Sequence, residues 1–259
     1  MEMRHQIEEK LRKLKMPGAL QALETRLSEA RENEMGHLEF LSLLLADELS
    51  HRDASGLAKR LKAAGFAGEK TFEGFDFRFN QEALPPAFLR DLASCHFLEQ
   101  KQSVVIGGPP GIGKSHIAKA IGHEACRRGY EVLFTTTQKL LSQCLTASPE
   151  RSQRLLRHAV RVPLLILDDF AFRKVDAREA ELLYVLADER IGKASTVLTS
   201  NRPPEDWYAT FPDPVVGGAI LDRMVSAAIK LITTKGRSYR KEVLGLRERN
   251  RAKPADKGS

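Results

Sequence analysis

Short strand-like runs alternate with longer segments of helical periodicity through the middle of the chain. Residues 104–106, 162–167 and 195–198 are runs of this kind, and each is followed by glycine or by polar residues. Buried parallel strands show this pattern. After the first run, Ile117, Ala118, Ile121 and Ala125 recur at helical spacing. Alternating strands and helices predict an α/β fold with a parallel sheet flanked by helices.

The first 68 residues follow a helical pattern of their own. Apolar residues share a face over residues 7–14, 20–27, 38–49 and 57–64, with Pro17-Gly18 and Met35-Gly36 as interruptions. We expect four helices in a small all-α domain at 1–68, suited to partner, DNA or oligomer contacts. A hinge at 65–70 would lead to the α/β domain at 69–245, and a basic, disordered tail would follow at 246–259.

The segment after the first strand reads GPPGIGKS and matches the phosphate-binding pattern G-x-x-x-x-G-K-[ST]. Glycines let backbone N–H groups turn toward phosphate oxygens, Lys114 supplies a cation for the β- and γ-phosphates, and the Ser115 hydroxyl can coordinate Mg²⁺. The motif predicts a nucleoside triphosphate site. Its candidate residues are Gly108, Pro109, Pro110, Gly111, Ile112, Gly113, Lys114, Ser115 and His116.

Polar residues also end the other two strands, where a parallel sheet would bring them to the edge that carries the phosphate loop. Asp168 is the candidate on the Mg²⁺ side, through water, and Asp169 is the candidate that orients or deprotonates the attacking water. Asn201 can reach the γ-phosphate or that water from the neighbouring strand. The alternatives are that the two acids cap the next helix and that Asn201 starts a turn.

The order of GPPGIGKS, LLILDDF, STVLTSNRPPEDW, AILDRM and GRSYR resembles the initiator and helicase-loader branch of the AAA+ ATPases. It is most similar to the IstB-type helper ATPases of bacterial insertion sequences, and the likeness extends to LKMPGALQAL and TFEGFDF nearer the N-terminus. The resemblance implies a P-loop AAA+ core. It makes Asp168 and Asp169 the Walker B acids, Asn201 sensor 1, Arg223 the arginine finger and Arg240 the sensor 2 arginine.

The same resemblance implies a function. An ATPase of this kind would hydrolyse ATP with Mg²⁺, using Lys114, Asp169, Asn201 and Arg223. It would assemble on duplex DNA as a ring or helical filament and assist a partner transposase. Many AAA+ enzymes have Glu where this chain has Asp169, and the shorter side chain implies slow hydrolysis. The alternatives are a DnaC-type replicative helicase loader, against which LKMPGALQAL argues, and an ATP-binding DNA scaffold with negligible hydrolysis.

The net charge of +7 is unevenly divided along the chain, at −3 over residues 1–100 and +10 over residues 101–259. The positive field therefore belongs to the nucleotide-binding half and indicates a polyanionic partner such as nucleic acid. Arginines there recur every three or four residues along one side of an expected helix. A solvated basic face is the alternative. The candidate DNA contacts are Arg151, Arg154, Arg157, Arg161, Arg173, Lys174 and Lys193.

The cysteine content and the distribution of apolar residues indicate the cellular location of the protein. The three cysteines lack the spacing of metal ligands, the N-terminus lacks the apolar stretch of a secretion signal, and no apolar run is long enough to span a bilayer. We therefore expect a cytoplasmic protein with reduced thiols and no membrane partner. Phe72, Phe75 and Phe77 lie just before the nucleotide-binding core. They would either pack beside the nucleotide base or, as we favour, fasten the linker to the core.

Overall fold

The computed structural model describes residues 2–66, 68, 70–243 and 245. The helices are α1 (Glu2–Lys13), α2 (Pro17–Glu32), α3 (His37–Ala64), α4 (Pro86–Ala93), α5 (His96–Glu99), α6 (Lys114–Arg127), α7 (Thr137–Thr146), α8 (Pro149–Arg161), α9 (Ala177–Arg190) and α10 (Pro214–Val225), with a 3-10 helix, η1, at Pro204–Thr210. The strands are β1 (Val104–Gly107), β2 (Val132–Thr136), β3 (Leu164–Asp168), β4 (Ser195–Ser200) and β5 (Ile229–Ile232). The basic tail expected at 246–259 lies outside the described residues.

The strands form one sheet in the order β2-β3-β4-β1-β5, and every neighbouring pair is parallel. This confirms the predicted parallel α/β core and its three predicted strands. The two strands that the pattern did not reveal, β2 and β5, lie at the edges of the sheet. Their mixed burial explains the weaker apolar signal, because only part of each edge strand faces the core.

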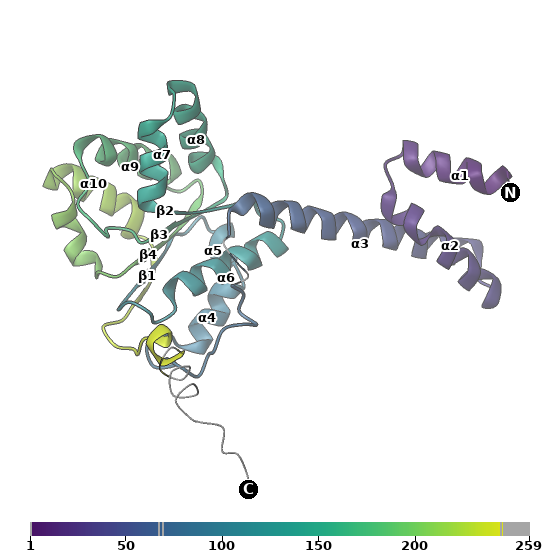
Figure 1. The fold of residues 1–259 in the computed structure, drawn as a ribbon, viewed down its shortest axis with the longest axis horizontal. Helices are drawn as coiled ribbons and strands as arrows, with labels where there is room; N and C mark the ends of the chain where they lie inside the picture. The colour runs from purple at the N-terminus through teal and green to yellow at the C-terminus, as the bar shows by residue number, and fades with distance from the viewer. Residues whose placement is uncertain (1, 67, 69, 244, 246–259) are drawn as a thin grey trace, which may run out of the picture. The chain divides into compact units, whose positions relative to one another are not determined.

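Helices cover both faces of the sheet: α7, α8, α9 and α10 lie on one side, and α4, α5 and α6 on the other (Figure 1). The core on the first side joins buried residues of α7, α8, α9 and α10 to Leu165 and Leu167 of β3. On the second side, α6 packs closely. A Cβ at Gly122 would lie 2.9 Å from Ile166 Cδ1 and 2.6 Å from Phe66 Cζ, so this position accepts only glycine without rearrangement.

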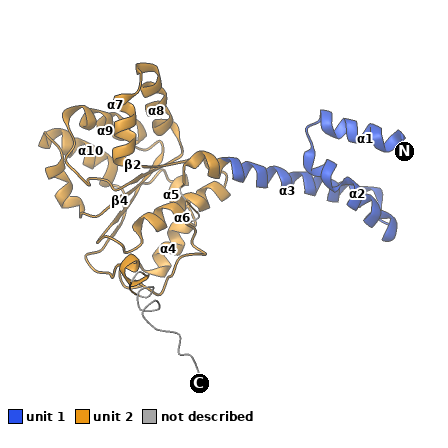
Figure 2. Ribbon diagram, in the orientation of Figure 1, with its two compact units in different colours: residues 1–59 blue, residues 60–259 orange. Residues whose placement is uncertain are grey.

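The chain divides into two compact units, residues 1–59 and residues 60–259 (Figure 2). The division comes earlier than the predicted boundary at residue 68. Residues 60–66 pack with the second unit, because Arg60 Nε donates to the Cys126 carbonyl at 2.9 Å and the Phe66 ring stacks on His123 with centroids 4.6 Å apart. The predicted hinge at 65–70 includes residues 67 and 69, which lie outside the described residues.

The first unit has a small apolar core and a buried polar cap. Glu48 is buried, and its carboxylate accepts hydrogen bonds from the N–H groups of Gly18 and Ala19 at 2.8 and 3.1 Å. These bonds satisfy donors at the start of α2 that the helix itself cannot satisfy. A Cβ at Gly18 would lie 2.5 Å from His51 Cβ, which explains the glycine of the LKMPGALQAL segment.

The prediction of two separate helices at 38–49 and 57–64 was wrong, because α3 runs unbroken from His37 to Ala64. The intervening residues contain Gly56 but no proline. An isolated glycine lowers helix stability without ending the helix, so the apparent gap was only a polar stretch of one long helix.

Arg190, at the end of α9, is buried, and among the described residues it has no carboxylate partner. Its guanidinium donates instead to the carbonyls of Ala159, Val160, Val162 and Ser195 and to the Thr196 hydroxyl. Burial lowers its pKa to about 10, so it remains charged near neutral pH. This side chain joins the C-terminal carbonyls of α8 to the start of β4, and the charge also suits the negative end of the α8 dipole.

Replacing Arg190 with Met should destabilise the protein by about 3 kcal/mol, because several buried acceptors would lose their donor. The free energy of unfolding in urea measures this change. Arg178→Met, on the exposed part of the same helix, provides the matched control and should stay within about 0.5 kcal/mol of the wild type. Equal effects of the two substitutions would contradict a structural role for the buried guanidinium.

Candidate functional site

The phosphate loop follows β1 and leads directly into α6. Gly111 and Gly113 have φ angles of 86° and 116°, in the region that favours glycine. A Cβ at Gly113 would also lie 3.0 Å from Phe75 Cε2. The loop therefore needs glycine at these positions for both conformation and space, and α6 begins at Lys114 with its N-terminal N–H groups at the loop.

Lys114 is buried, and its ammonium group is fully occupied by oxygen acceptors. Nζ donates to the Gly108 carbonyl at 2.7 Å, the Pro109 carbonyl at 2.8 Å and Asn201 Oδ1 at 2.7 Å. Burial lowers the pKa of Lys114 to about 8, although Asp169 and Asp168 act in the opposite direction. Asn201 and Lys114, which are 87 residues apart in sequence, thus meet in one site.

The Ser115 hydroxyl donates to Asp168 Oδ1 at 2.9 Å. The same carboxylate oxygen accepts a hydrogen bond from the Thr199 hydroxyl, and Thr199 Oγ1 accepts in turn from the Asp169 N–H at 3.1 Å. Thr199 lies on β4, between the strand of the phosphate loop and the strand of the two acids. It was not among the predicted site residues, although its position in the Thr199-Ser200-Asn201 segment is a signal that could have identified it.

Asp169 has a left-handed backbone, with φ of 54°, and its side chain is exposed at the edge of the sheet. Partial desolvation and the neighbouring Asp168 carboxylate raise its pKa, while the charges of Lys114 and Arg240 lower it. The carboxylates of Asp168 and Asp169 therefore lie in different environments. Asp168 is buried and hydrogen-bonded, whereas Asp169 is open to solvent and feels the field of two cations.

A segment near the C-terminal end of the described chain packs on the phosphate loop. The Tyr239 N–H donates to the Gly111 carbonyl at 3.0 Å, and a Cβ on Gly111 would lie 2.2 Å from Ser238 Oγ. Asn80 fixes this segment through both backbone groups of Arg237, accepting from its N–H and donating to its carbonyl at 2.9 Å each. Sequence pattern contained no signal for Asn80, because its partner is 157 residues away.

His116 and the phenylalanine segment meet beside the loop. His116 Nε2 lies 2.8 Å from the Thr71 carbonyl, and the Phe75 ring contacts the His116 ring edge-on with centroids 5.2 Å apart. Phe77 packs edge-on against Phe75 at 5.2 Å. These contacts fasten residues 71–77 to the start of α6, as we favoured from sequence. A role for His116 in nucleotide binding stays a prediction.

Arg223, on α10, lies apart from these residues. Its Nε donates to Asp188 Oδ1 at 3.0 Å, Nη1 donates to the Ala219 carbonyl at 3.0 Å, and the guanidinium lies 5.0 Å from the Tyr184 ring centroid. It also lines a cleft of about 270 Å³ together with Arg190 and residues 100–103. The phosphate-loop residues do not line this cleft, so Arg223 and the phosphate loop lie on different parts of the surface.

The predicted basic helix is α8. Among the described residues, Arg151, Arg154, Arg157 and Arg161 form no ion pair with any acidic side chain. All four are exposed. A row of like charges on one helix is unfavourable by itself, so an unpaired row of this kind is compatible with an anionic partner.

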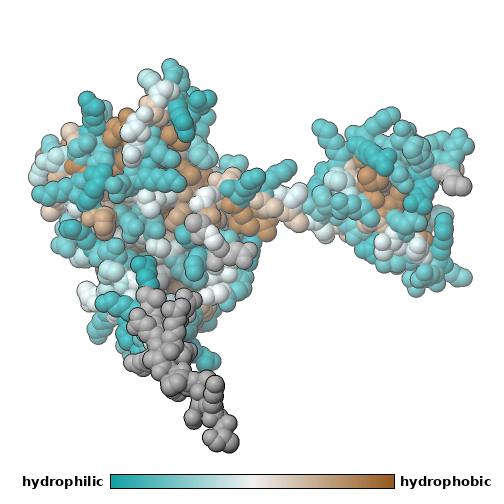
Figure 3. Space-filling model, in the orientation of Figure 1, coloured by the Kyte–Doolittle hydropathy of each residue, from teal (hydrophilic) through white to brown (hydrophobic). Residues whose placement is uncertain are grey.

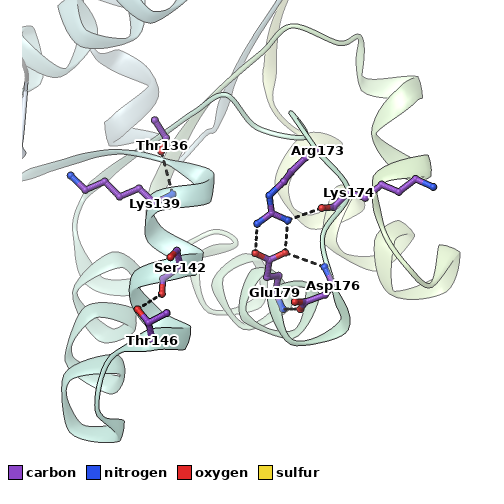
Figure 4. Close-up of polar contacts among 8 residues, drawn as sticks. All are labelled: Thr136, Lys139, Ser142, Thr146, Arg173, Lys174, Asp176 and Glu179. Carbon is purple, nitrogen blue, oxygen red and sulfur yellow. Dashed lines mark hydrogen bonds and ion pairs between the residues drawn. The ribbon is translucent and has the colours of Figure 1, made fainter.

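Other DNA candidates have internal partners. Arg173 forms a two-pronged ion pair with the buried carboxylate of Glu179 and also donates to the Lys174 carbonyl at 2.7 Å (Figure 4). Lys193 pairs with Glu189 at 3.3 Å. Lys174 is exposed and has no ion pair among the described residues. The pairing gives Arg173 a structural role that its position in the sequence did not indicate.

The fold and the loop together define a class of protein. Structures of similar fold include the DnaC helicase loader, with a TM-score of 0.51 at 19% identity over 57% of this chain and 87% of that one. Another is the replication initiator DnaA bound to AMPPCP and single-stranded DNA, with a TM-score of 0.56 at 18% identity over 74% of this chain and 58% of that one. At such low identity the likeness concerns the fold alone, which is that of P-loop AAA+ ATPase domains.

The particular family follows from sequence. Residues 9–245 match the IstB-like ATP binding protein family, and the chain belongs to it. It is 42% identical over 233 residues to an insertion-sequence ATP-binding protein of Mycobacterium tuberculosis, which covers 89% of this chain and 92% of the relative. It is 37% identical over 237 residues to the IS21 insertion-sequence ATP-binding protein of Pseudomonas aeruginosa, which covers 91% of this chain and 89% of the relative.

The lowered pKa of Lys114 predicts a pH dependence of ATP binding. Phosphate oxygens stabilise the ammonium form, so binding should take up a proton wherever free Lys114 is partly neutral. ATP affinity should therefore fall as pH rises through about 8. Calorimetric titration in two buffers of different ionisation enthalpy, between about pH 7 and about pH 9.5, measures both the affinity and the proton uptake.

Lys114→Arg is the control, because its cation does not titrate in this range. Its affinity, whatever its absolute value, should be independent of pH. A flat profile for the wild type would contradict either the lowered pKa of free Lys114 or its contact with the phosphates.

Proposed function

We propose that this chain is an ATP-hydrolysing DNA-binding protein that assists the transposase of an insertion sequence. The observation that carries the proposal is the meeting of Lys114 with Asn201 and of Ser115 with Asp168 beside a phosphate-loop backbone. Residues from three strand ends thus meet where triphosphate oxygens would lie. The insertion-sequence context of the relatives supports the transposition role, while the likeness to a helicase loader is one of fold alone.

In the proposed reaction, a water molecule attacks the γ-phosphorus, and the bond from that phosphorus to the β–γ bridging oxygen breaks. ADP and phosphate are the products. Asp169 orients this water and accepts its proton, Asn201 positions it from the neighbouring strand, and Lys114 stabilises negative charge on the phosphates. Arg240, whose charge already acts on Asp169, would approach the γ-phosphate from the C-terminal segment.

The donor set near Ser115 and Asp168 suits Mg²⁺. A hydroxyl and a carboxylate are hard oxygen ligands, and Mg²⁺ in triphosphate sites combines few protein ligands with phosphate oxygens and water. Ser115 Oγ and Asp168 Oδ1 are only 2.9 Å apart, so one ion can be served by both, with Asp168 acting through water. When bound, Mg²⁺ would neutralise charge on the β- and γ-phosphates.

Duplex DNA is the proposed polyanion, and α8 is its proposed main contact. Lys174 would add a contact from the loop after the two acids, whereas Arg173 and Lys193 would have to exchange an internal ion pair for a phosphate. Phosphate contacts of this type provide affinity without reading sequence. An assembly on DNA would place several such helices along one duplex.

The first unit is the proposed docking domain for the transposase. Several leucines of α3 are exposed at helical spacing, namely Leu38, Leu41, Leu45 and Leu49. Apolar residues form a band bordered by hydrophilic ones on the face of this unit shown in Figure 3.

Among the described residues, no helix combines the length and apolar character needed to cross a bilayer. We place the proposed activity in the cytoplasm, where ATP and DNA occur together.

Two measurements separate the alternatives. ATP turnover with and without duplex DNA separates an ATPase from an ATP-binding scaffold. Capture experiments with an insertion-sequence transposase, and in parallel with a replicative helicase, separate a transposition helper from a helicase loader. Binding to the helicase alone would overturn the transposition role and leave the ATPase chemistry intact.

Replacing Arg151, Arg154 and Arg157 together by Gln should weaken DNA binding for all sequences alike. The log–log dependence of affinity on salt should also flatten by about 0.9 for each duplex phosphate that the protein no longer neutralises. Fluorescence anisotropy with labelled duplex at several salt concentrations measures both effects.

The control removes the same number of charges from the side of the sheet that carries α4, α5 and α6. Lys62→Gln, Arg90→Gln and Arg128→Gln in one chain, all at exposed positions, should leave the slope unchanged. A slope that responds equally to both triple variants would mean that α8 is simply a solvated basic face.

Arg223 should act on the ATP of a neighbouring subunit. Arg223→Ala should bind ATP almost normally and lose hydrolysis by about 10³-fold, the scale usual for arginine fingers. Lys114→Ala should be inactive through loss of ATP binding. A mixture of the two inactive proteins should regain turnover, because an intact loop in one subunit meets an intact Arg223 in the next.

Co-assembly of the two variants has to be demonstrated first, for example by capture of one tagged variant with the other. Mixed oligomers that form and still fail to hydrolyse ATP would show that Arg223 does not complete a neighbour's site.

A further inference from the structure

Phe172 lies in the loop between β3 and α9, three residues after Asp169. All 12 phenylalanines fall within the described residues, and Phe172 alone is exposed, with 63% of its surface accessible. Phe170, two residues earlier, is buried at 1%. The loop therefore turns one ring inward and holds the next one in water, where apolar surface is unfavourable.

The loop is fixed on the N-terminal side of Phe172. The Phe170 ring packs on Trp207 with centroids 4.8 Å apart. The Phe170 N–H donates to the Thr199 carbonyl at 2.7 Å, and the Phe170 carbonyl accepts from Ser200 Oγ at 2.8 Å. Phe170 cannot shift to make room for Phe172 without losing these contacts with β4 and η1.

The loop is also fixed on the C-terminal side. Arg173 is held by Glu179, whose carboxylate also accepts from the Asp176 N–H at 3.0 Å, and the Asp176 carboxylate caps α9 by accepting from the Glu179 N–H at 2.9 Å (Figure 4). Between the two fixed points, Ala171 has a left-handed φ of 55°. Non-glycine residues in that conformation are strained, and such strain persists where the surroundings enforce it. The outward position of Phe172 is thus imposed by its neighbours.

Cations without acidic partners accompany this ring. Lys174 and Arg178 follow it in sequence, and Lys139 lies in the first turn of α7, which directly follows Thr136, the β2 residue paired with Asp168 in the register of β2 and β3. All three cations are exposed, and none forms an ion pair among the described residues. The carboxylate of Asp176 serves as the α9 cap and leaves their charge uncompensated.

We propose that Phe172 stacks on or inserts between the bases of duplex DNA, while the neighbouring cations contact the flanking phosphates. An aromatic ring can stack on the bases of a nucleic acid, and cations without acidic partners can neutralise its phosphates. The exposed ring and the cations beside it in sequence together suit both components of DNA. A second copy of this chain, the other possible occupant, would bring no phosphates to the unpaired cations. The inference rests on the DNA-binding part of the proposed function and assigns a base contact to it.

Phe172→Trp provides a direct probe, because stacking of an indole on nucleic-acid bases quenches its fluorescence. The native chain has one tryptophan, the buried Trp207, so the added emission reports the loop. The protein is titrated with duplex DNA in the presence of a non-hydrolysable ATP analogue. The added emission should fall by roughly half or more when DNA is bound, and should not change with the analogue alone.

Tyr208→Trp is the matched control. Tyr208 is 51% exposed but follows Glu205 and Asp206, so its surroundings repel phosphates. Its emission should not respond to DNA. A change of the Phe172→Trp emission with the ATP analogue alone would point to contact between subunits and would overturn the base contact, as would an emission that ignores both ligands.

A second variant separates this contact from phosphate binding. Phe172→Ala should weaken duplex affinity by about tenfold, the scale of removing one aromatic ring from a stacked base, without changing the salt slope, because every phosphate remains neutralised. The triple α8 variant should also weaken duplex affinity, but it should flatten the slope. If the α8 variant weakens DNA binding and Phe172→Ala does not, the proposed function is retained and the base contact of Phe172 is contradicted. Absence of duplex binding by the wild type would overturn both.

Discussion

Parallel pairing of β3, β4 and β1 brings the carboxyl ends of these strands to one edge of the sheet, and all the contacts of the proposed ATP site start from that edge. The strand of the two acids does not adjoin the strand of the phosphate loop, because β4 lies between them. Thr199 on β4 bridges the gap through its hydroxyl, which donates to Asp168 and accepts from the Asp169 N–H. The position of both acids relative to Ser115 thus depends on one strand.

Two buried cations show how the interior accommodates charge through hydrogen bonds to neutral oxygen atoms. Lys114 and Arg190 are both surrounded by carbonyl and side-chain oxygen atoms. Burial lowers the pKa of Lys114 to about 8 despite its three oxygen acceptors, so negatively charged phosphates would stabilise its ammonium form further. Arg190 retains its charge, and its several donors tie α8 to β4. Burial of Lys114 therefore favours the binding of an anionic ligand at the phosphate loop. Burial of Arg190 fixes the C-terminal end of α8, the proposed DNA-binding helix.

The loop after β3 lies between the proposed ATP site and the proposed DNA-binding surface. It begins at Asp169, turns through two left-handed residues and ends in the Arg173–Glu179 pair at the start of α9. Its rigidity leaves Phe172 exposed and keeps Asp169 at the edge of the sheet. Local strain of this kind is tolerated when surrounding contacts fix the backbone, and it occurs here between the proposed ATP chemistry and the proposed DNA surface.

The sequence by itself determined the phosphate loop, the three central strands, the two acids, Asn201 and the basic helix, because each depends on residue type, short spacing or periodicity. It divided α3 in two, since a polar stretch with one glycine gives no clear helix signal in isolation. Tertiary structure decided the rest: the roles of Thr199, Asn80 and Arg190, the internal pairing of Arg173 and the outward position of Phe172. These depend on partners that are distant along the chain or on the packing of a loop, and one-dimensional patterns do not encode such contacts.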